Sequence, residues 1–263
     1  MRGGRVLAWA AVTVAARPSP LARAWSAKWP IGAEIVLFFV LMAAYEWLRD
    51  LVAVSELAVP VAHALEVIDV ERALGLFVEP DVQEWAHSVP GGEFVTTWIY
   101  TLAHTAGFAV VFFWVWFRRR EYFAAFRNWF WVTNGLAVIG YWLYPLAPPR
   151  LTDLGLEDPT KASLELGGAL SWFQPFRNEF AAMPSMHVGY TVLFALTLFW
   201  LLRPSPWRWL VWLWPAGMLF VVMATANHWW LDGVGGAACV LVALAVVTPQ
   251  SGSLRKPWEY RRA

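Results

Sequence analysis

The residues that could carry chemistry occur in three short stretches of a largely apolar sequence. The stretches are "YPLAPPRL" with Arg150, "AAMPSMHVGY" with Ser185 and His187, and "NHWWLDGVGG" with Asn227, His228 and Asp232. Titratable groups beside apolar runs are costly to bury, and at membrane depth they are candidates for function. We therefore predict that the three stretches meet in one polar site.

The two histidines and the aspartate favour nucleophilic catalysis. His228 and Asp232 are spaced i, i+4, so they would share a face if this segment is helical. The carboxylate could then hold one ring nitrogen protonated and leave the other free to attack. Histidine titrates near neutral pH, which suits His187 to protonate a departing oxygen.

The neighbouring residues are typical of a phosphate site. Pro184 suits the first turn of a helix, where its missing N–H costs nothing, so Ser185 and the free N–H groups of that turn would form an anion-binding end. Arg150 follows two prolines and offers a planar fork that matches phosphoryl oxygens. Asn227 and Arg177 are further candidate phosphate ligands.

Each stretch also has a structural interpretation. A single histidine at a helix end is often solvated or capping, and the glycines at 233–236 favour close helix packing. A metal site is another use for His187, His228 and Asp232, but they lack the dense ligand set of zinc sites. The single cysteine, Cys239, excludes a disulfide framework within this chain. We expect no metal and no cofactor.

The composition indicates a membrane protein. Of 263 residues, 59% are hydrophobic and only 15% are charged, against about 25% in an ordinary soluble domain. A spanning helix needs about 20 mostly apolar residues, and six windows qualify. These windows cover residues 31–53, 93–117, 123–144, 185–203, 207–227 and 229–248. We expect an all-α, polytopic membrane protein with six transmembrane helices.

The positions of Lys and Arg predict the orientation of these helices. Most of them fall before residue 31, from 118 to 127, at 203 and 208, and after 254. Cytoplasmic loops are enriched in these residues, so we expect both termini in the cytoplasm and the three stretches at the extracytoplasmic face. The excess of Arg over Lys suggests a GC-rich genome and hence a bacterial plasma membrane.

The same pattern divides the chain into segments. We expect 1–30 to be a cytoplasmic or interfacial segment, because the apolar run within it lacks a signal-peptide cleavage site. Residues 31–248 form one six-helix membrane domain, and 249–263 form a cytoplasmic tail. Within the domain, 54–92 are predicted as amphipathic helices at the outer surface and 145–183 as an outer loop.

The motifs carry a resemblance to a known family. "PSMH", followed 41 positions later by the histidine of "HWWLD", resembles the type-two phosphatidic acid phosphatase superfamily. With "YPLAPPR" the stretches look most like its inositol-phosphotransferase branch, which includes the inositol phosphorylceramide synthases. The resemblance implies that His228 forms a phosphohistidine, that Asp232 orients it and that His187 protonates the leaving group. Ser185 and Arg150 would bind phosphate.

The sequence departs from the usual superfamily pattern at two customary phosphate-binding cations. The first motif usually has a Lys at the position of Leu143 and a Pro at that of Leu151. The third usually has Ser-Arg at the positions of Val221 and Val222. Fewer fixed cations favour a singly charged phosphodiester donor over a phosphomonoester dianion.

We therefore expect an integral-membrane lipid phosphatase or phosphotransferase. Its substrate would be a lipid phosphate, similar to phosphatidic acid or a polyprenyl phosphate, or a phospholipid head group. Water as acceptor would make a phosphatase, and inositol as acceptor, or transfer of phosphoinositol between lipids, a transferase. The expected partners are this lipid and the bilayer, with no nucleic acid.

A transporter or flippase is the alternative of a different class. Glu34, Glu46, His104 and Asn134 within the apolar windows could line a path. Transporters usually show repeats or broken helices at the midplane, whereas the polar stretches here gather at one boundary. The pattern favours the enzyme.

Overall fold

The computed structural model describes residues 29–54, 56–159 and 178–248. Within these ranges every regular element is helical, apart from an isolated bridge between Leu146 and Ala181. The all-α prediction is therefore confirmed. Most of the predicted segment 1–30, the tail 249–263 and Arg177 lie outside the described residues.

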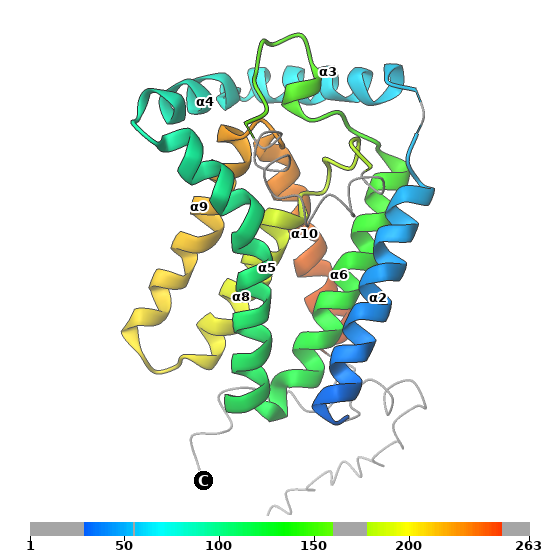
Figure 1. Cartoon of the computed structure of the whole chain (residues 1–263), viewed down its shortest axis with the longest axis vertical. Helices are drawn as coiled ribbons and strands as arrows, with labels where there is room; N and C mark the ends of the chain where they lie inside the picture. Colours follow the sequence, from blue (N-terminus) through cyan, green and yellow to red (C-terminus); the bar gives the residue numbers. More distant parts are fainter. Residues whose placement is uncertain (1–28, 55, 160–177, 249–263) are drawn as a thin grey trace, which may run out of the picture.

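The long helices run side by side as a bundle, and two shorter helices lie across one end of it (Figure 1). In chain order the α-helices are α2 (Ile31–Leu51), α3 (Ala58–Ala73), α4 (Glu79–Ser88), α5 (Gly92–Arg118), α6 (Phe123–Leu143), α8 (Met186–Leu201), α9 (Leu213–Ala224) and α10 (Trp230–Val247). Short 3-10 segments at Arg120–Tyr122, Pro149–Leu151 and Pro206–Trp212 precede or follow them.

Every predicted apolar window contains a helix, but not all of these helices could span a bilayer by themselves. Within the described ranges, three are long and apolar enough: Ile31–Leu51, Pro206–Ala224 and Trp230–Val247. α5 would be a fourth if its halves, which are bent by 45°, form one span. α8 is apolar but has only 16 residues. The structure supports a membrane protein and leaves six spans a prediction.

The predicted outer segment 54–92 forms α3 and α4, the two helices across the end of the bundle (Figure 1). Pro60 lies in the first turn of α3 and Pro80 at the start of α4, where neither removes a helical hydrogen bond. Ala64, Val67 and Ile68 of α3 pack with Leu146, Ala147, Ala182 and Trp229. These contacts place α3 directly over the segments that carry the candidate site.

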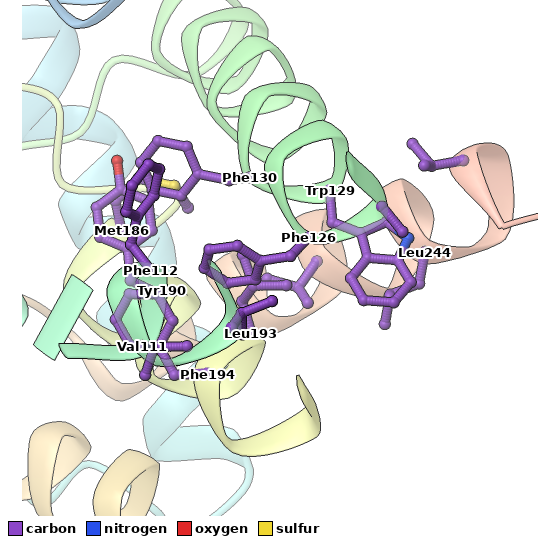
Figure 2. Close-up of a cluster of buried hydrophobic side chains, with 14 of the residues drawn as sticks. Val111, Phe112, Phe126, Trp129, Phe130, Met186, Tyr190, Leu193, Phe194 and Leu244 are labelled. Carbon is purple, nitrogen blue, oxygen red and sulfur yellow. The ribbon is translucent and has the colours of Figure 1, made fainter. Parts of the chain in front are cut away.

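A core rich in aromatic side chains joins α5, α6, α8 and α10 (Figure 2). It includes Phe112 from α5, Phe126 and Phe130 from α6, Tyr190 and Phe194 from α8, and Leu244 from α10. Offset and edge-on ring pairs add to their burial; for example, the Phe130 and Tyr190 rings stack with centroids 5.1 Å apart. This core fixes the relative positions of the helices that end at the site.

The polar residues considered for a transport path have structural partners. Arg127 Nη1 of α6 lies 2.7 Å from Glu34 Oε1 of α2, and both side chains are buried. Glu46 pairs with Arg49 on the same helix, and Asn134 accepts a hydrogen bond from Tyr190. The side chain of His104 lies outside the described part of the structure. The contacts of Glu34 and Asn134 join different helices and that of Glu46 lies within α2, so each of these three residues has a structural role.

Glycine allows α8 and α10 to approach closely. A Cβ atom on Gly236 would lie 2.2 Å from the Ser185 carbonyl oxygen and 3.1 Å from the Gly189 backbone nitrogen. Because both neighbours are backbone atoms, no side-chain rotation could relieve the contact. The packing role predicted for the glycines at 233–236 is seen at this position.

We predict that Gly236→Ala destabilises the protein by about 1–3 kcal/mol, because the added methyl must push α8 and α10 apart. Gly217→Ala on α9 is the matched control, since nothing lies within 4 Å of a Cβ there. Thermal unfolding of purified protein in detergent should show a lower midpoint for Gly236→Ala alone. Equal midpoints for the two variants would contradict the close approach.

Candidate active site

The His228 ring is held through one nitrogen by two hydrogen-bond acceptors. Nδ1 lies 2.9 Å from the Ala182 carbonyl oxygen and 3.3 Å from Asp232 Oδ2. A carbonyl and a carboxylate both accept, so Nδ1 must carry the hydrogen. In the neutral ring Nε2 is then unprotonated, which is the form that can attack an electrophile.

The contact between His228 and Asp232 does not arise from a shared helical face. α10 begins at Trp230, so His228 lies before the helix and Asp232 lies in its first turn. Asp232 Oδ2 also accepts the Trp229 backbone N–H at 2.9 Å, as the acidic residue of a capping box does. The i, i+4 spacing thus brings the pair together through a helix cap, which corrects the geometry expected from the sequence.

Ser185 lies at the start of α8, next to Asp232. Its backbone N–H donates to the Asp232 carbonyl oxygen at 2.8 Å, and its hydroxyl is fully buried with no hydrogen-bond partner among the described residues. Ser185 is the N-cap residue of α8, and Pro184 immediately precedes it. The prediction that Pro184 lies in the first turn of the helix is therefore wrong. An unsatisfied hydroxyl at a helix N-terminus suits an anionic oxygen.

His187 lies beside His228 although the two come from different helices. The ring centroids are 5.7 Å apart. On its other side, the His187 ring stacks on Tyr100 of α5 with centroids 4.1 Å apart and planes 22° apart. The stack holds a partly exposed histidine in one orientation next to the buried one.

Arg150 is tied to the turn that carries His228. Its Nη1 donates to Asn227 Oδ1 at 2.7 Å, and its backbone N–H donates to the Ala226 carbonyl at 3.1 Å. Its Nε also lies 3.1 Å from Asp158 Oδ2 in an ion pair that is mostly buried. The guanidinium therefore lies against the turn and already has an acidic partner.

Two further carboxylates, one on α3 and one on α4, reach the start of α10. Glu79 Oε1 accepts the Trp230 N–H at 2.9 Å, and Glu71 Oε1 accepts the Leu231 N–H at 3.3 Å. Burial raises the pKa of both carboxyl groups, that of Glu71 to about 9. Glu71 and Glu79 lie next to the site, although the sequence did not predict them as site residues.

The structure thus brings together six predicted site residues: Arg150, Ser185, His187, Asn227, His228 and Asp232. Within the described ranges, no group of three or more His, Cys, Asp or Glu side chains could hold a metal ion. The six residues bring two histidines, a carboxylate and hydrogen-bond donors suited to an anion close together.

A comparison with known families shows to which family the chain belongs. The model of the PAP2 superfamily matches residues 65–246, which is well over half of the chain and contains all six residues. The chain belongs to the PAP2 superfamily. Membership supports a phosphatase or phosphotransferase that acts on lipid phosphates. No curated protein and no solved structure matches the chain.

Several residues at the site of this PAP2 superfamily member were missed from the sequence. The Ala182 carbonyl belongs to the backbone and leaves no signal in side-chain types. In segments rich in acidic residues carboxylates are usually solvated, so nothing in the sequence singles out Asp158, Glu71 and Glu79. Tyr100 lies in an apolar window, where an aromatic residue gives no sign of a contact with a histidine. Their roles depend on contacts that sequence spacing does not reveal.

We predict that Tyr100→Leu lowers turnover of a lipid phosphate by about three- to tenfold, because an aromatic stack is worth about 0.5–1.5 kcal/mol beyond its burial. Tyr100→Phe keeps the ring against His187 and should retain clearly more activity. Initial rates of both purified variants test this expectation. If Tyr100→Leu turned over as fast as the unchanged protein, the stack would not position His187.

Proposed function

We propose that this protein is a lipid phosphatase or phosphotransferase that works through a phosphohistidine on His228. One observation carries the proposal: His228 Nδ1 faces the Ala182 carbonyl and the Asp232 carboxylate, which leaves Nε2 as the nucleophile. A nucleophilic side chain that is held in one orientation by its neighbours is typical of covalent catalysis.

In the first step, the Nε2 lone pair of His228 attacks phosphorus and forms an N–P bond. The bond from phosphorus to the lipid oxygen breaks, and that oxygen takes a proton from the His187 imidazolium. The products are a lipid alcohol and a phosphohistidine, which the neighbouring Asp232 carboxylate stabilises because the ring has become cationic. A separation of 5.7 Å between the ring centroids supports one phosphoryl group in contact with both histidines.

In the second step, the now neutral His187 acts as a base. It takes a proton from water or an alcohol while the oxygen of that acceptor attacks phosphorus, and the N–P bond breaks. His228 and the His187 imidazolium are restored. Water yields a phosphatase, and an alcohol such as inositol yields a transferase.

The remaining predicted residues would hold the phosphoryl oxygens. The free hydroxyl of Ser185 and the N–H groups at the start of α8 are one set of donors. The guanidinium of Arg150 is another, steadied by Asn227. Arg177 is proposed as a further phosphate ligand from the sequence alone.

The proposed topology has six spans, with both termini in the cytoplasm and the site at the extracytoplasmic face of a bacterial plasma membrane. The distribution of Lys and Arg supports this orientation. The helices in all six apolar windows support the number of spans, with α8 as a short span and α5 as a bent one. α3 and α4 would lie on the outer surface, where exposed Leu65 and Trp85 suit the bilayer interface.

His228→Ala should reduce activity to less than about a hundredth, because loss of a nucleophile costs orders of magnitude. Purified protein would be mixed briefly with phosphatidic acid labelled at phosphorus and then quenched in alkali. The label should remain on the unchanged protein and be released by acid, as a phosphohistidine requires. His228→Ala should carry no label, and retained turnover in this variant would contradict the covalent route.

Asp232→Asn should leave a folded enzyme that is slower by about ten- to a hundredfold. The amide keeps the shape of the side chain but cannot compensate the charge of the phosphohistidine. Thermal unfolding measured beside the rate separates this effect from loss of the helix cap. A rate within about twofold of the unchanged protein would remove Asp232 from the proposed chemistry.

A second candidate function, transfer of a head group such as phosphoinositol, is favoured by the ion pair between Arg150 and Asp158. Asp158 already balances the guanidinium charge, with Nε 3.1 Å from Oδ2. A phosphomonoester dianion would meet more repulsion from this carboxylate than a singly charged phosphodiester would. The pair therefore supports a diester donor, as in the inositol-phosphotransferase branch that the motifs resemble.

We predict that Asp158→Asn raises the kcat/KM for phosphatidic acid, relative to that for phosphatidylinositol, by about three- to tenfold, through reduced repulsion of the dianion. Both reactions release diacylglycerol, so one product assay serves both substrates, with and without added inositol. Asp153→Asn removes the same charge at an exposed position of the same segment and is the matched control. An unchanged ratio in Asp158→Asn would argue against the diester preference.

A further inference from the structure

Glu71 and Glu79 form a buried acid pair that the proposed chemistry does not use. Glu71 lies in the last turns of α3, Glu79 begins α4, and both side chains are fully buried. Each accepts one backbone N–H from the start of α10, from Leu231 and Trp230 respectively. Burying two carboxylates is costly unless the contacts compensate for the lost water. The surroundings of the pair must therefore offset this cost.

The buried position of the pair favours one proton for its two carboxyl groups. Both groups are fully buried and accept the N–H groups of adjacent residues, so two negative charges would lie close together where water is excluded. Glu71 Oε2 is also buried with no hydrogen-bond partner among the described residues, which favours an uncharged carboxyl group there. Burial, and then the charge of Glu79, raise the pKa of Glu71 to about 9, and the Asp232 charge at the start of α10 acts in the same direction.

We propose that Glu71 and Glu79 are positioning residues that fix the start of α10 and thereby aim the imidazole of His228. The inference rests on the proposed function, because it takes His228 as the nucleophile. Neither glutamate contacts the substrate. They act through the backbone of the residues that follow the histidine.

The contacts explain how the pair can control the histidine. The first N–H groups of a helix have no partner within the helix, and an anionic acceptor there is favourable. The acid pair supplies such acceptors from α3 and α4, two and three residues after His228. Phe77, between these helices, stacks on the Trp229 ring with centroids 6.5 Å apart. Glu71 and Glu79 thus hold the backbone of the residues that follow His228, and Phe77 packs against the side chain of Trp229.

A second negative charge on the pair would weaken this arrangement. Loss of the shared proton would place two adjacent carboxylates next to Asp232, which is the carboxylate that holds His228 Nδ1. Like charges at close range repel strongly where water is excluded. The positioning of α10 therefore depends on this proton, and an experiment can detect the loss of the proton at high pH.

The first test compares thermal unfolding of the unchanged protein and Glu71→Gln across pH 5–10. Glu71 keeps its proton in the folded state up to about pH 9 but loses it in the unfolded chain above about 4.5. Its contribution to stability is therefore present below about 4.5 and is lost progressively as the pH rises to about 9. Glu71→Gln cannot lose a proton, so its midpoint should exceed that of the unchanged protein by an amount that grows with pH.

Glu84→Gln provides the matched control, because Glu84 is an exposed carboxylate on α4. Its midpoint should follow that of the unchanged protein at every pH. A difference between Glu71→Gln and the unchanged protein that stays constant from pH 5 to 10 would mean that the pair holds no proton, and it would overturn the proposal. This readout does not depend on activity.

The second test measures kcat and KM at pH 7.5. Glu71→Gln, which keeps an oxygen that can accept from Leu231, should keep kcat within about threefold of the unchanged protein. Glu71→Met has a similar length without polar atoms and should lower kcat by about tenfold or more with KM nearly unchanged, because the nucleophile is misaligned. A Glu71→Met variant with full kcat would overturn the positioning role.

His228→Ala in the same assays separates the two proposals. If His228→Ala remains active, the nucleophile is assigned wrongly and the proposed function fails. If His228→Ala is inactive but neither glutamate variant responds as expected, only the positioning role fails.

Discussion

The structure depends on the hydrogen bond from the Ser185 N–H to the Asp232 carbonyl oxygen, at 2.8 Å between α8 and α10. The two helices can approach this closely because Gly236 has no side chain where the Ser185 carbonyl lies. The histidines lie on either side of the contact: His187 follows Ser185 and His228 precedes Asp232. One backbone contact therefore joins the two segments that carry the imidazole rings. The aromatic core packs the same two helices against each other with side chains of α5 and α6 (Figure 2).

The sequence predicts the membrane character, the helical windows and most of the site, because these follow from side-chain type. An apolar run can be recognised without knowing what it contacts. The polar residues beside such runs are equally visible, and they include Ser185, His187, His228 and Asp232. The geometry of the nucleophile could not be predicted in the same way. The hydrogen bond at 2.9 Å comes from the Ala182 carbonyl, and backbone atoms have no signature in a sequence. The contact between His228 and Asp232 is present in the structure, although it forms through a helix cap and not on a shared helical face.

The number of spans shows a different limit of sequence-based prediction. A hydropathy window counts apolar residues, whereas the capping residues at each end determine where a helix begins and ends. The window at 185–203 contains a helix of 16 residues that starts after Ser185 and ends before Pro204. The window at 207–227 begins as a 3-10 segment and becomes α-helical only at Leu213. The apolar content was therefore recognised better than the helix length.

The charges around His228 constrain what the site can bind. Asp232 contacts the ring, Asp158 pairs with Arg150, and the buried carboxyl groups of Glu71 and Glu79 accept N–H groups at the start of α10. In the proposed mechanism, the positive charge that meets the substrate must therefore come largely from protonated imidazole and from backbone N–H groups. These donors are weaker than fixed cations against a dianion but sufficient for a single charge. In the proposed mechanism, the carboxylates that orient His228 thus also select against highly charged phosphates, so that positioning and specificity would have the same physical origin.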